Sequence, residues 1–458
     1  MTYDIAVIGA GVVGAAIARE LAATDRSVVL LEAGSDIGDG TSKANSALLH
    51  TGYDEKPGSL ETRLVVRGFG LLRDYAARTG IAVENTGALL VAWDDEQLAN
   101  LPVMASRAVE NTGESARELS PDQVYARMPA LGPGVRGGLL IEGESIIDPW
   151  APTLAYVSDG IARGMRLRLR THVETVTPGP EHTVLSTNAG DVTARWVVNA
   201  AGQGADHIDH AFGFSRFHVS PRRGEFIVFD KLARPLAPHI LMPVPTIRGK
   251  GVLVTPTVFG NVMLGPTSED VEDRTDKSTS ESGLAGLLEK GRRLIPDLVG
   301  EQVTATYAGL RAATEHSDYV VDADPDQRYV CLGGIRSTGL TSSLAVAEYV
   351  RDLMATAGCE LDQRSDLPAP VEVPNLGEAF PRPYADASLI ERDAEYGRTV
   401  CFCERVTAGE VRDAMQSAVP PPTPQALRRR TRAVMGRCQG FYCGAEVERL
   451  FAEGKGGQ

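Results

Sequence analysis

The chain has 458 residues, of which 43% are hydrophobic and 23% charged, so it can bury a large core and form two or three domains. Its net charge of −14 disfavours nucleic acid as a partner. No apolar run approaches the length of a membrane-spanning helix, and residues 1–30 lack the features of a secretory signal.

A dinucleotide-binding pattern opens the chain: a strand, a glycine-rich turn, a helix and a second strand that ends in an acid. Gly9 permits the sharp turn, Gly11 lets the backbone approach a pyrophosphate, and Gly14 lets helix and strand pack closely. Glu32 is placed to accept hydrogen bonds from a ribose, which disfavours NADP and leaves FAD or NAD. The predicted strands and helix are Tyr3–Ile8, Val28–Leu31 and Ala15–Ala23.

The rest of the chain is expected to divide into three parts. A cofactor-binding domain takes up about 1–90, 145–213 and 306–360, with a helix at Thr153–Arg163. Substrate-binding insertions lie at about 91–144, with a helix at Glu96–Leu119, and at 214–305, where β signals predict an antiparallel sheet. Together these segments form a unit over residues 1–362. A proline-rich linker at 363–398 then leads to a small domain at 399–458.

Four cysteines in the last domain form a C-x-C pair and a C-x4-C pair: Cys401, Cys403, Cys438 and Cys443. Four thiolates brought together can hold zinc or an iron–sulfur cluster. Neither pair has the C-x2-C spacing of a typical zinc knuckle, which favours the cluster. The basic run Arg428–Arg437 between the pairs is a solvated helix face, an offset to the cluster's negative charge, or a docking site for an acidic partner.

Both ends of the chain resemble known families. Residues 400–411 and 428–444 closely resemble the bacterioferritin-associated-ferredoxin-like [2Fe-2S] domain, including all four ligand positions. Gly40–Tyr53, Val197–Gly202 and Tyr329–Thr341 resemble the flavin-contacting segments of the D-amino-acid-oxidase-like superfamily, which implies FAD. The flavin contacts implied by this resemblance are Thr41, Ser42, Lys43, Asn45, Ala201, Gly202, Gly334, Gly339, Leu340 and Thr341.

These resemblances imply an α/β fold: a Rossmann-like FAD domain of the glutathione-reductase type, an antiparallel β-sheet substrate domain, and a small helical [2Fe-2S] domain. A flavin accepts a hydride while a positioned base removes the hydroxyl or amine proton. The resemblance places His50 as that base; the alternative is a histidine that only packs near the ring. Arg311 and Arg336 are implied as ligands of the substrate's anionic group, or are ordinary salt-bridged arginines.

As a whole the chain resembles the catalytic subunit of anaerobic glycerol-3-phosphate dehydrogenases, which implies hydride transfer from glycerol 3-phosphate to FAD and electron exit through the cluster. Residues 56–60, KPGSL, also resemble enzymes that oxidise L-2-hydroxyglutarate, so a 2-hydroxy acid stays open as substrate, and so does an amino acid or amine. An electron-transfer subunit without its own substrate is the second alternative. Expected partners are a small anionic substrate and an electron-acceptor protein or quinone-linked subunit. Such a partner could attach the chain to a membrane, and oligomers are possible. The cluster and the missing signal favour the cytoplasm.

Overall fold

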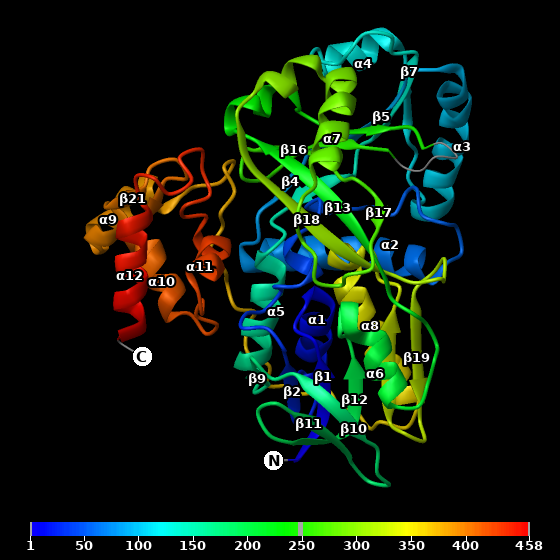
Figure 1. The fold of residues 1–458 in the computed structure, drawn as a ribbon, viewed down its shortest axis with the longest axis vertical. Helices are drawn as coiled ribbons and strands as arrows, with labels where there is room; N and C mark the ends of the chain where they lie inside the picture. The colour runs from blue at the N-terminus through cyan, green and yellow to red at the C-terminus, as the bar shows by residue number, and fades with distance from the viewer. Residues whose placement is uncertain (1, 246–250, 457–458) are drawn as a thin grey trace.

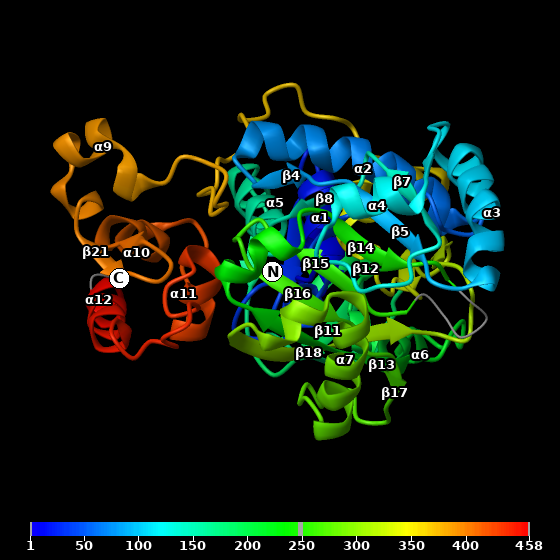
Figure 2. The same cartoon turned by 90° about the horizontal axis from the view of Figure 1, so that it is seen from above.

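The computed structural model describes residues 2–245 and 251–456. Figure 1 shows a large body built on two sheets and, beside it, a small body formed by the C-terminal part of the chain, coloured orange to red. Helix α11 (Pro424–Thr431) lies on the side of the small body that faces the large one, as Figure 2 also shows. No helix among the described residues is both long and apolar enough to cross a bilayer.

The first sheet of the large body holds the glycine-rich turn. Its central strands run parallel, and three further strands pair with them antiparallel at the edges. The parallel strands are β1 (Thr2–Ile8), β2 (Val28–Leu31), β9 (Arg166–Arg168), β12 (Val192–Asn199) and β20 (Tyr329–Gly333); the others are β10 (Val173–Thr177), β11 (Thr183–Thr187) and β19 (Val320–Asp324). The parallel strands agree with the Rossmann-like FAD domain that the resemblance implies, and the antiparallel strands make the sheet mixed.

Helices cover this sheet and pack on one another. Helix α1 (Val12–Leu21) buries small residues, among them Ala15, Ala16 and Ala18, and this lets two neighbouring helices approach it closely. Those neighbours and the other helices of this region are α5 (Ala151–Ala162), α8 (Gly339–Thr356), α2 (Leu60–Thr79) and α6 (Ala205–Ala211). A small sheet of β3 (Leu48–Leu49), β8 (Ser145–Ile147) and β4 (Val83–Asn85) lies beside them.

The second sheet combines strands from both predicted insertions. Most of its pairs are antiparallel, as predicted, but β14 and β5 pair in parallel, so the sheet is mixed. Its strands are β5 (Ala88–Ala92), β6 (Arg117–Leu119), β7 (Gly137–Ile141), β13 (Ser220–Phe229), β14 (Ile240–Pro243), β15 (Leu253–Pro256), β16 (Val262–Gly265), β17 (Glu269–Asp270) and β18 (Val303–Ala313). Helices α3 (Asp95–Thr112), α4 (Pro121–Arg127) and α7 (Glu281–Leu294) flank it.

The helix predicted at Glu96–Leu119 is too long. Helix α3 begins after Asp94, whose side chain accepts from the Gln97 N–H, and ends at Gly113, which has a φ of 74°. A glycine in this left-handed conformation is a common helix terminator. The chain then turns back, and Arg117–Leu119 forms strand β6 at the edge of the second sheet.

The small body has its own core of apolar side chains beneath three helices. It contains β21 (Thr399–Cys401), β22 (Val406–Thr407), α10 (Ala408–Gln416), α11 and α12 (Gly444–Gly456). A reciprocal capping box of Thr407 and Glu410 starts α10. The segment predicted as a linker runs along the large body and then forms the short helix α9 (Ala387–Arg392).

Candidate active site and cluster site

A cleft between the two sheets of the large body collects the predicted nucleotide-binding residues. Its lining includes these predicted residues: Gly9, Gly11, Gly14, Glu32, Thr41, Ser42, Asn45, Ala201, Gly202, Gly334, Arg336, Gly339 and Leu340. Lys43 and Thr341 lie outside that lining. Lys43 bonds to Asp39 and faces the small body, while Thr341 accepts a hydrogen bond from the His50 backbone.

The turn before α1 fits a pyrophosphate because side chains are excluded from it. Gly9 has a φ of 103°, and a Cβ there would lie 2.4 Å from the Ala200 carbonyl oxygen. A Cβ on Gly14 would meet the Gly9 oxygen at 1.9 Å. The Val12 N–H at the start of α1 points to the Ser42 hydroxyl at 2.9 Å. The start of α1 lines the cleft, and a helix N-terminus there suits phosphate oxygens.

Glu32 directly follows β2, at the position where the sequence predicts a contact to a ribose. Its carboxylate accepts the Ala10 N–H at 2.8 Å and the Gly34 N–H at 2.7 Å, which fix its orientation towards the turn. It lines the same cleft as Gly9 and Gly11, as the fingerprint predicts.

Three carboxylate side chains surround the His50 ring, and we call this group the carboxylate nest. Its Nδ1 is 2.8 Å from Glu144 Oε1 and its Nε2 is 2.9 Å from Asp54 Oδ1, with Glu55 at 3.6 Å. Burial disfavours the charged ring, but the charge of Glu144 and hydrogen bonds to Asp54, Glu144 and Glu55 outweigh it and raise the pKa of His50 well above its usual 6.5. Carboxylate oxygens facing both ring nitrogens favour the protonated ring, an arrangement that the sequence did not reveal.

Within the described part of the chain, Arg311 differs from the other candidate arginines because no acid forms an ion pair with it. It lies on β18 opposite Arg222, and its guanidinium packs over Gly224, where a Cβ would meet Nη2 at 2.9 Å. Its Nη1 is buried without a hydrogen-bond partner among the described residues. Burial and the charge of Arg222 lower the pKa of Arg311. A buried guanidinium left in this way is costly unless an anion completes it.

The other arginines are already neutralised. Arg336 donates to Glu61 at 2.7 Å and to the Ser317 carbonyl. The neighbouring pair on β13 is also matched by acids: Arg222 by Asp270, and Arg223 by Glu269 and Asp276. Arg336 lines the cleft, but unlike Arg311 it is paired with an acid, Glu61.

Two basic residues in the cleft were missed by the sequence analysis. Arg274 donates to both carboxylate oxygens of Asp206, and Lys277 donates to the Asp39 carbonyl at 3.4 Å; both line the cleft. They stand in a polar segment that follows β17 and has no apolar periodicity. Their only sequence signal was positive charge within an acidic stretch.

The four predicted cysteines come together in the small body. Cys403 interacts with Cys438, and Cys401 with Cys443, so both pairs combine one residue from each motif. Gly436 lies so close that a Cβ there would be 2.3 Å from the Cys403 Cβ.

The surroundings of these thiols suit a metal cluster. The backbone N–H of Tyr442, then those of Gly440 and Phe441, donate to Cys438 and lower its pKa. Backbone N–H groups aimed at a sulfur stabilise its thiolate form, which is the form that ligates metal. All four cysteines are free of disulfides.

The basic run of the small body docks on the large body. Asp36, which is 2% exposed, accepts from Arg429 at 2.6 Å and from Arg430 at 2.6 and 3.0 Å. Burial raises the pKa of Asp36, but hydrogen bonds and charge from Arg430 and Arg429 outweigh it, so the pKa lies below its usual value. The prediction that the basic run is a solvated helix face is therefore wrong. Its acidic partner is Asp36 of the same chain.

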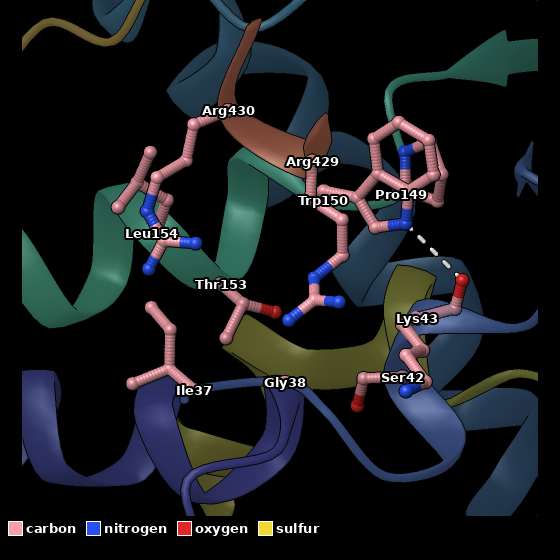
Figure 3. Close-up of a pocket in the computed structure, with 10 residues that line it drawn as sticks. All are labelled: Ile37, Gly38, Ser42, Lys43, Pro149, Trp150, Thr153, Leu154, Arg429 and Arg430. Atoms are coloured by element: carbon pink, nitrogen blue, oxygen red, sulfur yellow. Dashed lines mark hydrogen bonds between the residues drawn. The ribbon is translucent and has the colours of Figure 1, made fainter. Parts of the chain in front are cut away.

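Trp150 lines the same pocket as Arg429 and Arg430 (Figure 3). Its Nε1–H donates to the Lys43 carbonyl at 3.1 Å, the dashed line in Figure 3. The Trp150 ring also stacks on Phe259, with 5.3 Å between the ring centroids. Arg432 of the small body lies 4.1 Å over Phe259 and donates to Asn261 and Glu404. The segment that carries Ser42 and Lys43 thus contacts both the cleft and, through Trp150, the small body.

Comparisons with known proteins identify the families of the two bodies. The profile of the FAD dependent oxidoreductase family matches residues 4–353, and that of the BFD-like [2Fe-2S] binding domain matches residues 399–453. The glycerol 3-phosphate dehydrogenase of Caloramator mitchellensis is 32% identical over 98% of this chain and 94% of its own length. One subunit of the anaerobic glycerol-3-phosphate dehydrogenase of Escherichia coli (strain K12) is 26% identical, covering 98% of this chain and 87% of that protein.

A solved structure shares the fold of the large body. The L-alpha-glycerophosphate oxidase of Mycoplasma pneumoniae, dithionite reduced with FAD bound, aligns with a TM-score of 0.77 and 26% identity. The alignment covers 82% of this chain and 99% of that one.

Proposed function

The chain belongs to the FAD dependent oxidoreductases and ends in a BFD-like [2Fe-2S] binding domain, and on this premise we propose that it oxidises glycerol 3-phosphate to dihydroxyacetone phosphate. Bound FAD supplies the hydride acceptor, and the bound [2Fe-2S] cluster supplies a one-electron carrier. The substrate loses two electrons and two protons: a hydride from C2 and the proton of its hydroxyl group.

The guanidinium of Arg311, whose buried Nη1 has no hydrogen-bond partner among the described residues, is the observation that supports an anionic substrate most strongly. Two oxygens of a phosphate can accept hydrogen bonds from the planar guanidinium of Arg311. Such a pair of bonds orients the substrate and increases its affinity. Arg311 follows Ala308, Gly309 and Leu310, which line the cofactor cleft, so an anion bound there lies next to the nucleotide site.

The carboxylate nest around His50 is the proposed destination of the hydroxyl proton. Asp54 and Glu144 contact the two nitrogens of His50, so a proton that reaches the ring lies beside a carboxylate on either side. Thr341 at the start of α8 holds the His50 backbone, and residues 339 and 340 before it line the cleft. This connection ties the nest to the cofactor site.

The small body supports electron exit to a partner. We infer that a partner protein accepts electrons from the cluster. One relative that aligns with 98% of this chain is named as a subunit of an anaerobic dehydrogenase. Attachment to a quinone-linked subunit, peripheral contact with a membrane through that subunit, and a cytoplasmic location belong to the same proposal. The free cysteine thiols agree with a reducing compartment.

The substrate is tested by anaerobic reduction of the enzyme-bound flavin. sn-Glycerol 3-phosphate should bleach the flavin rapidly, while glycerol, which lacks the phosphate, and L-2-hydroxyglutarate should be slow. Bleaching by the hydroxy acid alone would overturn the proposal. Bleaching by neither compound would favour an amine substrate or an electron-transfer subunit.

A further inference from the structure

The apolar side chains that the structure leaves exposed are not spread evenly. Among the described residues, the large hydrophobic side chains with high exposure fall into two groups, and one group, Leu98, Val103 and Val109, lies on α3. The other group combines three residues of the cysteine motifs with two residues of the large body: Phe402, Phe441, Tyr442, Leu232 and Val303. A concentration of exposed apolar side chains on a soluble protein marks an interaction site more often than isolated ones do.

Three aromatic residues of this group stand between the cluster ligands. Phe402 separates Cys401 from Cys403 and is 73% exposed. Phe441 and Tyr442 precede Cys443, are 84% and 78% exposed, and contact each other edge to face at 5.1 Å. Since these residues belong to the ligand loops, any molecule that covers them is brought against the cluster.

The large body adds two more residues. Leu232 is 64% exposed and lies two residues after Asp230. The Asp230 carboxylate accepts a hydrogen bond from Arg437 at 2.6 Å. Val303 is 52% exposed and precedes Thr304, whose carbonyl accepts from Gln439 at 2.5 Å. Both bodies therefore flank the ligand loops. We call Phe402, Phe441, Tyr442, Leu232 and Val303 the cluster-rim patch.

We propose that the cluster-rim patch is the docking surface for an electron-accepting protein that carries its own one-electron cofactor. The inference rests on the proposed function, because it requires electrons to leave through the cluster. In each encounter the cluster loses one electron and the partner's cofactor gains one, so two encounters follow the oxidation of one substrate molecule. Exposed aromatic residues are enriched at protein interfaces, and electron-transfer interfaces are small.

The charges beside the patch favour a protein over a lipid surface. Binding to an anionic membrane needs unpaired Lys and Arg next to the apolar residues. Here Arg437 is paired with Asp230, and Arg405 with Glu378. A second copy of the chain would set one cluster against another and would offer no final acceptor. The occupant is therefore apolar at its centre, with a polar rim and a redox cofactor.

A photo-crosslinking residue at position 232 tests the identity of the occupant. Benzoylphenylalanine in place of Leu232, in the full chain expressed in cells of its source, should form an adduct with a protein that holds a flavin, haem or iron–sulfur cofactor. Val103 on α3, which is 52% exposed, is the control position and should not form this adduct. Adducts only with lipid, only with a second copy, or equally from both positions would overturn the proposal.

Charged substitutions test the function of the patch. The double variant Leu232→Asp and Val303→Asp should reduce electron delivery to an extract of the source cells by at least about tenfold, since charges at an apolar interface centre are strongly unfavourable. The control Val103→Asp and Val109→Asp should deliver electrons at the normal rate. Reduction of a small soluble dye should be unchanged in both variants.

The enzyme in this second experiment is reduced photochemically, without substrate. A wrong substrate assignment then leaves the result intact, and failure of the docking surface can be distinguished from failure of the proposed function. Equal rates of delivery from the patch variant and the control would overturn the docking surface.

Discussion

Arginines of the small body differ from Arg311 of the large body in how they are neutralised. In the small body Arg429 and Arg430 meet the buried Asp36 of the large body. In the large body Arg311 is half-buried, with no acid beside it among the described residues. The pairs with Asp36 connect the two bodies, whereas an unpaired arginine can be completed by an anionic ligand. The same residue type thus has a structural role in one place and a binding role in the other.

Removing the unpaired arginine should have the largest effect. Arg311→Ala should lower kcat/KM for glycerol 3-phosphate by about 10²- to 10³-fold, since two charge-assisted hydrogen bonds are lost. The FAD content should stay normal. Steady-state kinetics with a soluble dye and flavin absorbance measure the two quantities.

Arg222→Ala is the matched control, because Arg222 lies opposite Arg311 but is exposed and paired with Asp270. Its effect should stay within about threefold. Equal losses in the two variants would contradict the distinction between paired and unpaired arginines.

Breaking the docking pair should have the next largest effect. Asp36→Asn leaves Arg429 and Arg430 without a full counter-charge, and loss of one partner of a buried pair costs about 3–5 kcal/mol. The small body should separate more often, so limited proteolysis within residues 363–398 should be faster. Flavin-to-cluster electron transfer should slow, while flavin reduction by substrate stays unchanged.

Arg449→Ala provides the comparison for that variant. Among residues that the structure describes, Arg449 forms ion pairs only within α12, with Glu446 and Glu453, on the surface of the small body. Proteolysis and electron transfer should match the unsubstituted protein. If Asp36→Asn behaves like this control, the ion pair does not hold the bodies together.

The carboxylate nest predicts a shift in the pH dependence. Glu144 is the strongest contribution that raises the pKa of His50, so Glu144→Gln should lower that pKa. The unprotonated ring would then persist to lower pH, and the rising limb of the kcat/KM profile should move in the same direction. An unmoved limb would show that His50 is not the group that titrates.

The aromatic contact should give the smallest effect. Trp150→Leu removes the stack on Phe259 and the hydrogen bond to Lys43, a loss of about 1–2 kcal/mol. Flavin-to-cluster transfer should slow several-fold, measured by rapid-mixing spectroscopy. Trp150→Phe keeps a ring for stacking and should recover most of the rate.

The sequence was sufficient where a function depends on neighbouring residues. Strand β2 has the predicted bounds Val28–Leu31, and the glycine turn and Glu32 share one cleft as expected. Short-range steric rules fix such features, because the glycines meet the backbone beside them.

Contacts between residues that are distant in the sequence could not be predicted from it. Asp36 and Arg430 are 394 positions apart, and no local pattern indicates which acid meets which base. The raised pKa of His50 depends on Glu144, which is 94 positions away. The helix predicted at Glu96–Leu119 failed because Gly113 ends it and the second sheet recruits the remaining residues.

The central claim is that electrons from glycerol 3-phosphate reach the cluster of the same chain through FAD. Anaerobic rapid mixing of the holoenzyme with sn-glycerol 3-phosphate, followed by electron paramagnetic resonance of frozen samples, tests it directly. The account predicts that the flavin bleaches first and that the signal of a reduced [2Fe-2S] cluster appears afterwards. A bleached flavin with no cluster signal at any time would contradict it.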